Sequence, residues 1–73
     1  MVTLKLPASE IQAGDILHYD EGNVWRVIDV TTSGKSVDIR FEYLASDYAP
    51  WRVGTTNAHR LRASTVRPVE RNA

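Results

Sequence analysis

The chain contains no cysteine, only one phenylalanine and one methionine, and no long uninterrupted run of apolar residues. Without cysteine, neither a disulfide bond nor a thiolate zinc site can supplement the hydrophobic core. Without an apolar run of about 20 residues, no helix can span a bilayer. The alternating segment 1–7 is also too short for the apolar region of a signal peptide. We therefore expect a cytoplasmic protein that makes no use of a membrane.

What the sequence does contain is the composition of an ordinary folded domain. Hydrophobic residues make up 42% of the 73 residues and charged residues 25%, which is typical of globular chains and not of disordered ones. A chain of this length has a small core, because folding buries only about 60% of the unfolded surface. We expect a single domain over residues 1–70 and a disordered tail over residues 71–73.

The formal net charge is zero, but the charges are distributed unevenly. Up to Ala49 there are eight acidic and four basic residues, whereas from Pro50 onward there are five arginines and one acid. The five arginines are Arg52, Arg60, Arg62, Arg67 and Arg71. Such asymmetry is typical of a surface that binds nucleic acid or an acidic protein. A fold that mixes the two halves would instead neutralise it.

Alternation of apolar and polar residues predicts short β-strands along most of the chain. The clearest lies at 36–44, where the apolar residues from Val37 to Tyr43 alternate with polar ones. A single helical turn is expected at 9–12, which has the Ser-x-x-Gln spacing of a capping box. The remaining strands are predicted at 2–6, 15–19, 24–31, 51–53, 59–63 and 65–69. The last of these contains Pro68, which lacks an amide donor and therefore predicts an edge strand or a strand end.

We expect five or six of these segments to form short antiparallel strands, which with tight turns and one helical turn predict an all-β fold. So short a sheet buries its apolar face best by curling onto itself, and we expect a small barrel. A sandwich of two sheets is the alternative. Trp25 and Phe41 lie in the strongest strands and are expected in the core.

The segments Ala8–Ile16 and Asp20–Val27 contain a lead-in, a Gly-Asp bend, a strand, a Gly-containing turn and an aromatic-x-Val strand, in this order. This order resembles the opening of small Src-homology-3-like barrels, which include KOW-type modules and the N-terminal domain of translation elongation factor P. The resemblance extends to Leu44 and implies a Src-homology-3-like barrel. The abundance of threonine, arginine and alanine is similar to that of small accessory proteins of actinobacteria and their phages.

Motifs for catalysis or for cofactors are not apparent. The tripeptide 34–36, Gly-Lys-Ser, invites comparison with a phosphate-binding loop, but Asp29 stands where that motif needs glycine and no long helix follows. We interpret it as a hairpin turn. His18 and His59 lack a diagnostic metal-ligand spacing, and no nucleophile-elbow pattern is present. The expected protein is not an enzyme and holds no metal or cofactor.

One group of residues is a candidate binding site. Its members are Trp51, Arg52, Arg60, Arg62 and Arg67. Arg60 and Arg62 fall on one face of a predicted strand, so that face would present two guanidinium groups in line. A neighbouring aromatic side chain, Trp51 or Tyr48, would stack on a base while the arginines bind phosphates. The alternative is that the arginines only solubilise a sheet and that Trp51 closes the core.

Two functions remain open from the sequence. The first is a nucleic-acid-binding protein that uses the C-terminal arginines. The second is a protein-interaction module, such as a phage or regulatory accessory factor, which docks onto a partner through an aromatic loop or through an edge strand near Pro68. The oligomeric state is left open.

Overall fold

The computed structural model describes residues 2–20 and 22–71, and these residues form six strands and two short 3-10 turns. In chain order the elements are β1 (Val2–Pro7), η1 (Ala8–Glu10), β2 (Ile16–Asp20), β3 (Asn23–Ser33), β4 (Ser36–Ser46), η2 (Pro50–Arg52), β5 (Thr56–Arg62) and β6 (Val66–Arg71). The prediction of an all-β chain is therefore confirmed. None of the described helical turns is long and apolar enough to cross a membrane.

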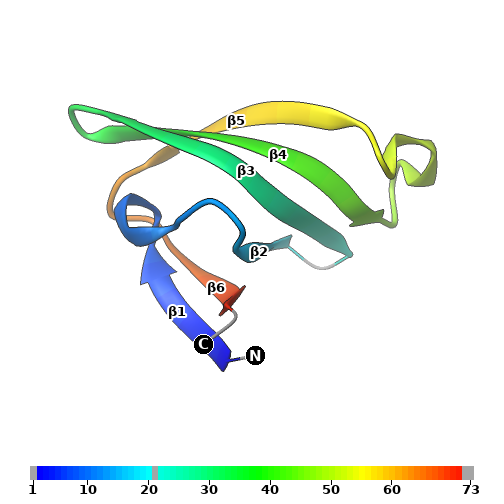
Figure 1. Ribbon diagram of the computed structural model, residues 1–73, viewed down its shortest axis with the longest axis horizontal. Coiled ribbons are helices and arrows are strands. Elements are labelled where there is room, and N and C mark those ends of the chain that lie inside the picture. The colour runs from blue at the N-terminus through cyan, green and yellow to red at the C-terminus, as the bar shows by residue number, and fades with distance from the viewer. Residues whose placement is uncertain (1, 21, 72–73) are drawn as a thin grey trace.

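The six strands belong to one antiparallel sheet with the order β1-β6-β2-β3-β4-β5, so the strands are not divided between the two sheets of a sandwich. Strands β3 and β4 form a long hairpin, and β1 and β5 are the two edges of the sheet. Figure 1 shows β3, β4 and β5 above β2, β6 and β1. The sheet is therefore folded over, and its two parts face each other.

Two irregularities in the β3–β4 hairpin bend this sheet. Leu44 is the extra residue at the first register shift, and Ile28 is the extra residue at the second. A β-bulge of this kind bends a strand and increases its twist. The second bulge also changes which side chains face inward. Val27 is buried before it, and Val30 packs against the core after it, while Ile28 is exposed.

The core lies between the two parts of the sheet and is built around aromatic rings. Trp25 stacks between Tyr19 and Phe41, with ring centroids 4.5 Å and 3.7 Å away, and Tyr43 meets both Trp25 and Phe41 edge-on. The buried apolar residues of this cluster are Ala8, Ile11, Leu17, Trp25, Val27, Val37, Ile39, Phe41, Tyr43, Leu61 and Val69. The prediction that Trp25 and Phe41 belong to the core is confirmed.

The Gly-Asp bend before β2 is held by an ion pair between a buried aspartate and a partly exposed arginine. Asp15 is 2% exposed, and Arg71 donates to both of its carboxylate oxygens at 2.8 Å and 2.7 Å. Burial alone would raise the pKa of Asp15, but the hydrogen bonds from Arg71 and from the Gln12 backbone and the charge of Arg71 lower it below its ordinary value. The pair joins the last described residue of β6 to the lead-in of β2.

Three local predictions were wrong. Residues 51–53 were expected to form a strand, but η2 and a turn lie there. The last strand was expected at an edge or to end near Pro68, yet β6 lies between β1 and β2 and runs on to Arg71. Its ladder with β2 includes only Val69 and Glu70, so Pro68 is paired only with Lys5 of β1. Arg71, predicted to begin the tail, is a strand residue, and residues 72–73 lie outside the described ranges.

Candidate functional site

The fold distributes the five predicted site residues over three places. Arg60 and Arg62 point outward from β5 on either side of the buried Leu61, as the alternation predicts. Arg67 lies on β6, in the other part of the sheet. Trp51 and Arg52 lie in η2, at one end of β5, whereas Arg62 lies at the other end (Figure 1). The five residues therefore do not form one continuous binding face.

Arg60 is engaged by a carboxylate from the neighbouring strand. Its Nε and Nη2 atoms donate to the two carboxylate oxygens of Asp38 at 2.8 Å and 3.4 Å. These hydrogen bonds, followed by the charge of Arg60, lower the pKa of Asp38. Both side chains are exposed, so the pair contributes little to stability. It does, however, neutralise one of the two arginines on the outward face of β5.

Arg52 and Arg67 lie over aromatic rings of the core cluster. The Arg67 guanidinium carbon is 4.8 Å from the ring centroid of Tyr19, and Arg67 Nη1 donates to the Tyr19 carbonyl oxygen at 3.0 Å. The corresponding distance from Arg52 to the Tyr43 ring is 5.9 Å, and Arg52 Nη1 donates to the Tyr43 hydroxyl oxygen at 3.4 Å. These cation–π contacts cover the aromatic core. Both arginines therefore have a structural role in the folded chain.

The segment between β4 and β5, residues 47–55, presents large apolar side chains to solvent and is here called the aromatic loop. Tyr48, Trp51 and Val53 are 79%, 75% and 49% exposed. The alternative that Trp51 closes the core is wrong, because this side chain lies outside it.

The backbone of the aromatic loop is well anchored despite its exposed side chains. The amide of Gly54 donates to the Tyr43 carbonyl oxygen at 2.8 Å, and the amide of Tyr43 donates to the Thr55 carbonyl oxygen at 2.9 Å. The buried Ala49 donates its amide proton to the Ser46 hydroxyl oxygen at 3.2 Å. The loop therefore holds its apolar side chains outward on a fixed support.

Strand β5 is an open edge next to the aromatic loop. It pairs with β4 from Thr56 to Arg62, and the described residues supply no strand on its other side. The unpaired backbone groups of such an edge can pair with an added strand. Sequence reasoning missed this edge because it assigned the edge position to the strand that contains Pro68. Strand order depends on pairings between distant segments, and no local signal in β5 distinguishes an edge.

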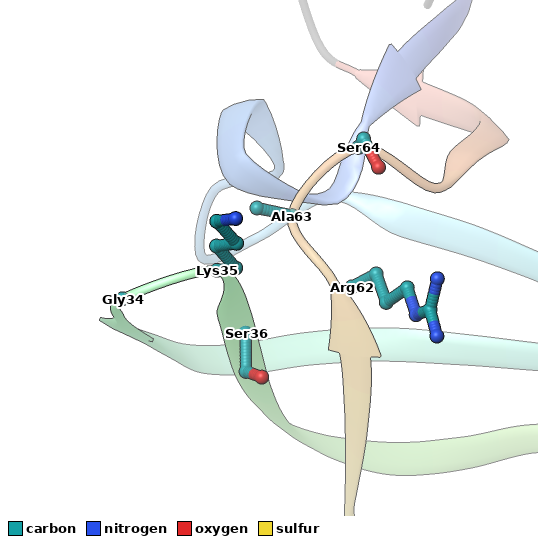
Figure 2. Close-up of a pocket in the computed structure, with 6 residues that line it drawn as sticks. All are labelled: Gly34, Lys35, Ser36, Arg62, Ala63 and Ser64. Carbon is teal, nitrogen blue, oxygen red and sulfur yellow. The ribbon is translucent and has the colours of Figure 1, made fainter.

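A hollow of about 550 Å³ lies at the opposite end of β5, beside the β3–β4 turn. Its lining residues are Gly34, Lys35, Ser36, Arg62, Ala63 and Ser64 (Figure 2). Within the described part of the chain, neither Lys35 nor Arg62 forms an ion pair with a carboxylate. The sequence drew attention to the Gly-Lys-Ser tripeptide, and Gly34, with φ +59, does form the hairpin turn. Its proximity to Arg62 follows only from the pairing of β4 with β5.

The two histidines have different environments, and neither belongs to a metal centre among residues 2–20 and 22–71. His18 Nε2 is 3.3 Å from a carboxylate oxygen of Glu70. His59 Nε2 is hydrogen-bonded to the Tyr19 hydroxyl at 3.1 Å, between strands that are not neighbours in the sheet.

Comparison with protein-family models, with curated proteins and with solved structures found no match. The function is therefore inferred from the geometry of the aromatic loop, the β5 edge and the hollow.

Proposed function

We propose that this protein is a non-enzymatic interaction module that docks a partner protein through the aromatic loop and the adjoining edge of β5. The exposure of Tyr48, Trp51 and Val53 carries this proposal. These three residues are half of the exposed large hydrophobic residues found in the described ranges, and all three fall in one short segment. Single exposed apolar residues are normal, but a group of them marks an interaction site. Tryptophan and tyrosine are also the residues that most often dominate binding energy.

The β5 edge supplies the second element of the proposed interface. An extended segment of a partner can add to an exposed edge, where backbone hydrogen bonds provide affinity and side-chain contacts provide specificity. Apart from the small Ala58, the outward side chains of β5 are polar, so they offer little apolar surface. The aromatic loop then provides the apolar anchor at the Thr56 end of the strand.

The scaffold proposed for this module is a Src-homology-3-like barrel that stays open between its edge strands. The two bulges in the β3–β4 hairpin support it, because they bend the sheet. The hydrogen bond between Tyr19 on β2 and His59 on β5 supports it as well, since it joins strands that are not neighbours in the sheet. Such a curled sheet would hold β5 in place while leaving its outer backbone edge accessible.

To test the docking proposal, the wild-type protein is immobilised and used to purify a binding partner from cell extract. The affinity of the purified partner is then measured for wild type and for variants. We expect a Tyr48→Ala/Trp51→Ala variant to bind the purified partner at least about tenfold more weakly, equivalent to about 1.4 kcal/mol. Val66→Ala is the matched control, because Val66 is an exposed apolar residue outside the aromatic loop. Amide hydrogen exchange should also slow along β5 in the complex. Undiminished binding by the double variant, or unchanged exchange in β5, would contradict the proposal.

Nucleic-acid binding is the second candidate function. It is favoured by the exposed side chains of Lys35, Arg40 and Arg62, which form no ion pair with a carboxylate in the described ranges. The test is a fluorescence-anisotropy titration of labelled single- and double-stranded DNA and RNA at low and moderate salt. If this function holds, binding weakens steeply with salt and falls in an Arg40→Ala/Arg62→Ala variant. No binding by folded protein at low salt would exclude it.

A further inference from the structure

The hollow beside the β3–β4 turn is lined by groups that can bind a phosphate. Lys35 and Arg62 supply an ammonium and a guanidinium group, and Ser36 and Ser64 supply hydroxyl donors. These are groups that form charge-assisted or ordinary hydrogen bonds with phosphate oxygens. In Figure 2, Lys35 and Ser36 come from one wall of the hollow, and Arg62 and Ser64 come from the other.

The positive charge of this hollow is not compensated by the described carboxylates. Asp38 is the nearest outward carboxylate along β4, and it is already held by Arg60. The other described pairs join carboxylates to Arg26, Arg71 and His18. Lys35 and Arg62 therefore belong to the lysine and arginine residues that form no ion pair with a described carboxylate, and they are the two of that group that line the hollow.

The walls of the hollow are fixed, whereas its cationic side chains are free to adjust. The Ala63 amide donates to the Lys35 carbonyl oxygen at 2.8 Å, and the Thr65 amide donates to the Arg62 carbonyl oxygen at 3.0 Å. Figure 2 shows the Arg62 guanidinium extending away from Lys35. Both side chains are long and exposed, so rotation about their torsions can bring them to one anion.

The surroundings favour a single phosphate group over a chain of phosphates. Asp38 and Glu42 lie on the same outward face of β4 as Ser36, each is paired with an arginine, and the exposed Arg40 lies between them. A nucleic-acid backbone that followed the sheet away from the hollow would therefore meet alternating charges and no continuous row of cationic groups. One phosphorylated side chain would meet only Lys35 and Arg62.

We propose that the hollow binds one phosphate group carried by a phosphorylated side chain of the partner segment along β5. The position of that segment rests on the proposed docking function, whereas phosphate binding itself does not. Strand β5 has seven residues, and at about 3.3 Å per residue the hollow and the aromatic loop are roughly 20 Å apart. The partner segment then carries its phosphorylated residue about six positions from the apolar side chain that contacts Trp51.

The test follows amide resonances of the ¹⁵N-labelled protein during titration with three probes at constant ionic strength. The probes are inorganic phosphate, N-acetyl-phosphoserine amide and its unphosphorylated form. We expect saturable shifts at residues 34–36 and 62–65 with the first two probes and none with the third. Lys35→Ala and Arg62→Ala should each weaken phosphate binding at least about fivefold, corresponding to about 1 kcal/mol.

Arg26→Ala is the matched control, since Arg26 is paired with Glu42 away from the hollow. It should leave phosphate binding unchanged. Three results would contradict the proposed phosphate site: chemical-shift changes that do not saturate, changes that spread over the other arginines, or changes that persist in Lys35→Ala and Arg62→Ala. A single-stranded oligonucleotide serves as a further probe. If it binds more tightly than N-acetyl-phosphoserine amide and shifts the amide resonances of both Arg62 and Arg40, the hollow binds nucleic acid instead. No partner protein is present in these titrations, so their failure leaves the docking proposal intact, and failure of the docking test leaves the phosphate site intact.

Discussion

The interior and the surface of this protein use the same residue types with opposite consequences. Trp25 is 5% exposed and stacks between two rings, whereas Trp51 is 75% exposed on η2. The two aspartate–arginine pairs differ in the same way, because Asp15 is buried against Arg71 and Asp38 is exposed beside Arg60. Burial therefore decides whether a tryptophan or an ion pair stabilises the fold or remains exposed at the surface.

The largest expected effect is the loss of the interior tryptophan. Trp25→Ala removes the central ring of the stack and leaves a cavity, which costs about 3 to 5 kcal/mol of unfolding free energy. Small domains have total stabilities at the low end of about 5 to 15 kcal/mol, so this variant should be largely unfolded. Urea denaturation followed by circular dichroism measures the effect. A loss below about 1 kcal/mol would show that the stack is not central to the core.

The buried aspartate comes next. Asp15→Asn leaves Arg71 without its charged partner and, because Arg71 is partly exposed, should cost about 1.5 to 3 kcal/mol. The folded-state pKa of Asp15 is lowered, so the stability contributed by its carboxylate is fully present above its unfolded pKa of about 3.9. It is lost as the pH falls through the lowered pKa.

The pH dependence of the melting temperature provides a second measurement of this pair. Wild type should lose stability on acidification below about pH 4, and Asp15→Asn should lose less. Equal acid sensitivity of the two proteins would assign the dependence to other carboxylates.

A much smaller effect on stability is expected for the surface tryptophan. Trp51→Ala should change the unfolding free energy by no more than about 0.5 kcal/mol, because the side chain leaves no cavity in the core. The same urea experiment used for Trp25→Ala compares the two tryptophans directly. If Trp51→Ala were as destabilising as Trp25→Ala, the aromatic loop would be part of the core and unavailable for docking.

The smallest effect is expected for the exposed ion pair. Asp38→Asn breaks the pair with Arg60, but both groups remain hydrated, so the urea midpoint should stay within experimental error. The matched comparison is Asp15→Asn, which alters the same residue type in the interior. A clear destabilisation by Asp38→Asn that disappears at high salt would show that the surface charges act as a network.

Much of the local structure could be predicted because it depends on neighbouring residues. The alternation at 36–44 marks β4, and Gly34 marks the turn before it. Gly22, with φ +87, lies in the β2–β3 turn, and a Cβ there would collide with the Asp47 side chain. Positive φ is readily adopted by glycine, so the turn was visible in the sequence. The unequal distribution of charge along the chain was visible too, but which of these charges form ion pairs was not.

The candidate site was harder to predict because its parts come from distant segments. Arg60 was expected to bind phosphate, yet Asp38 lies opposite it once β5 pairs with β4. Arg71 was assigned to a tail, but it meets Asp15 across the sheet. These pairs join acids of the first part of the chain to two of the five arginines of the last part, and so the fold neutralises part of the asymmetry.

The sequence by itself determined most of the strand-forming segments, most of the turns and the identity of two core aromatic residues, Trp25 and Phe41. Each of these depends on side-chain alternation or on backbone freedom within a few residues. The tertiary structure alone decided that β5 is an edge, that Trp51 is exposed and that Lys35 and Arg62 share a hollow. Strand order and register arise from pairings between segments far apart in the chain, and the position of one strand decides which charges are paired and which remain available for a ligand.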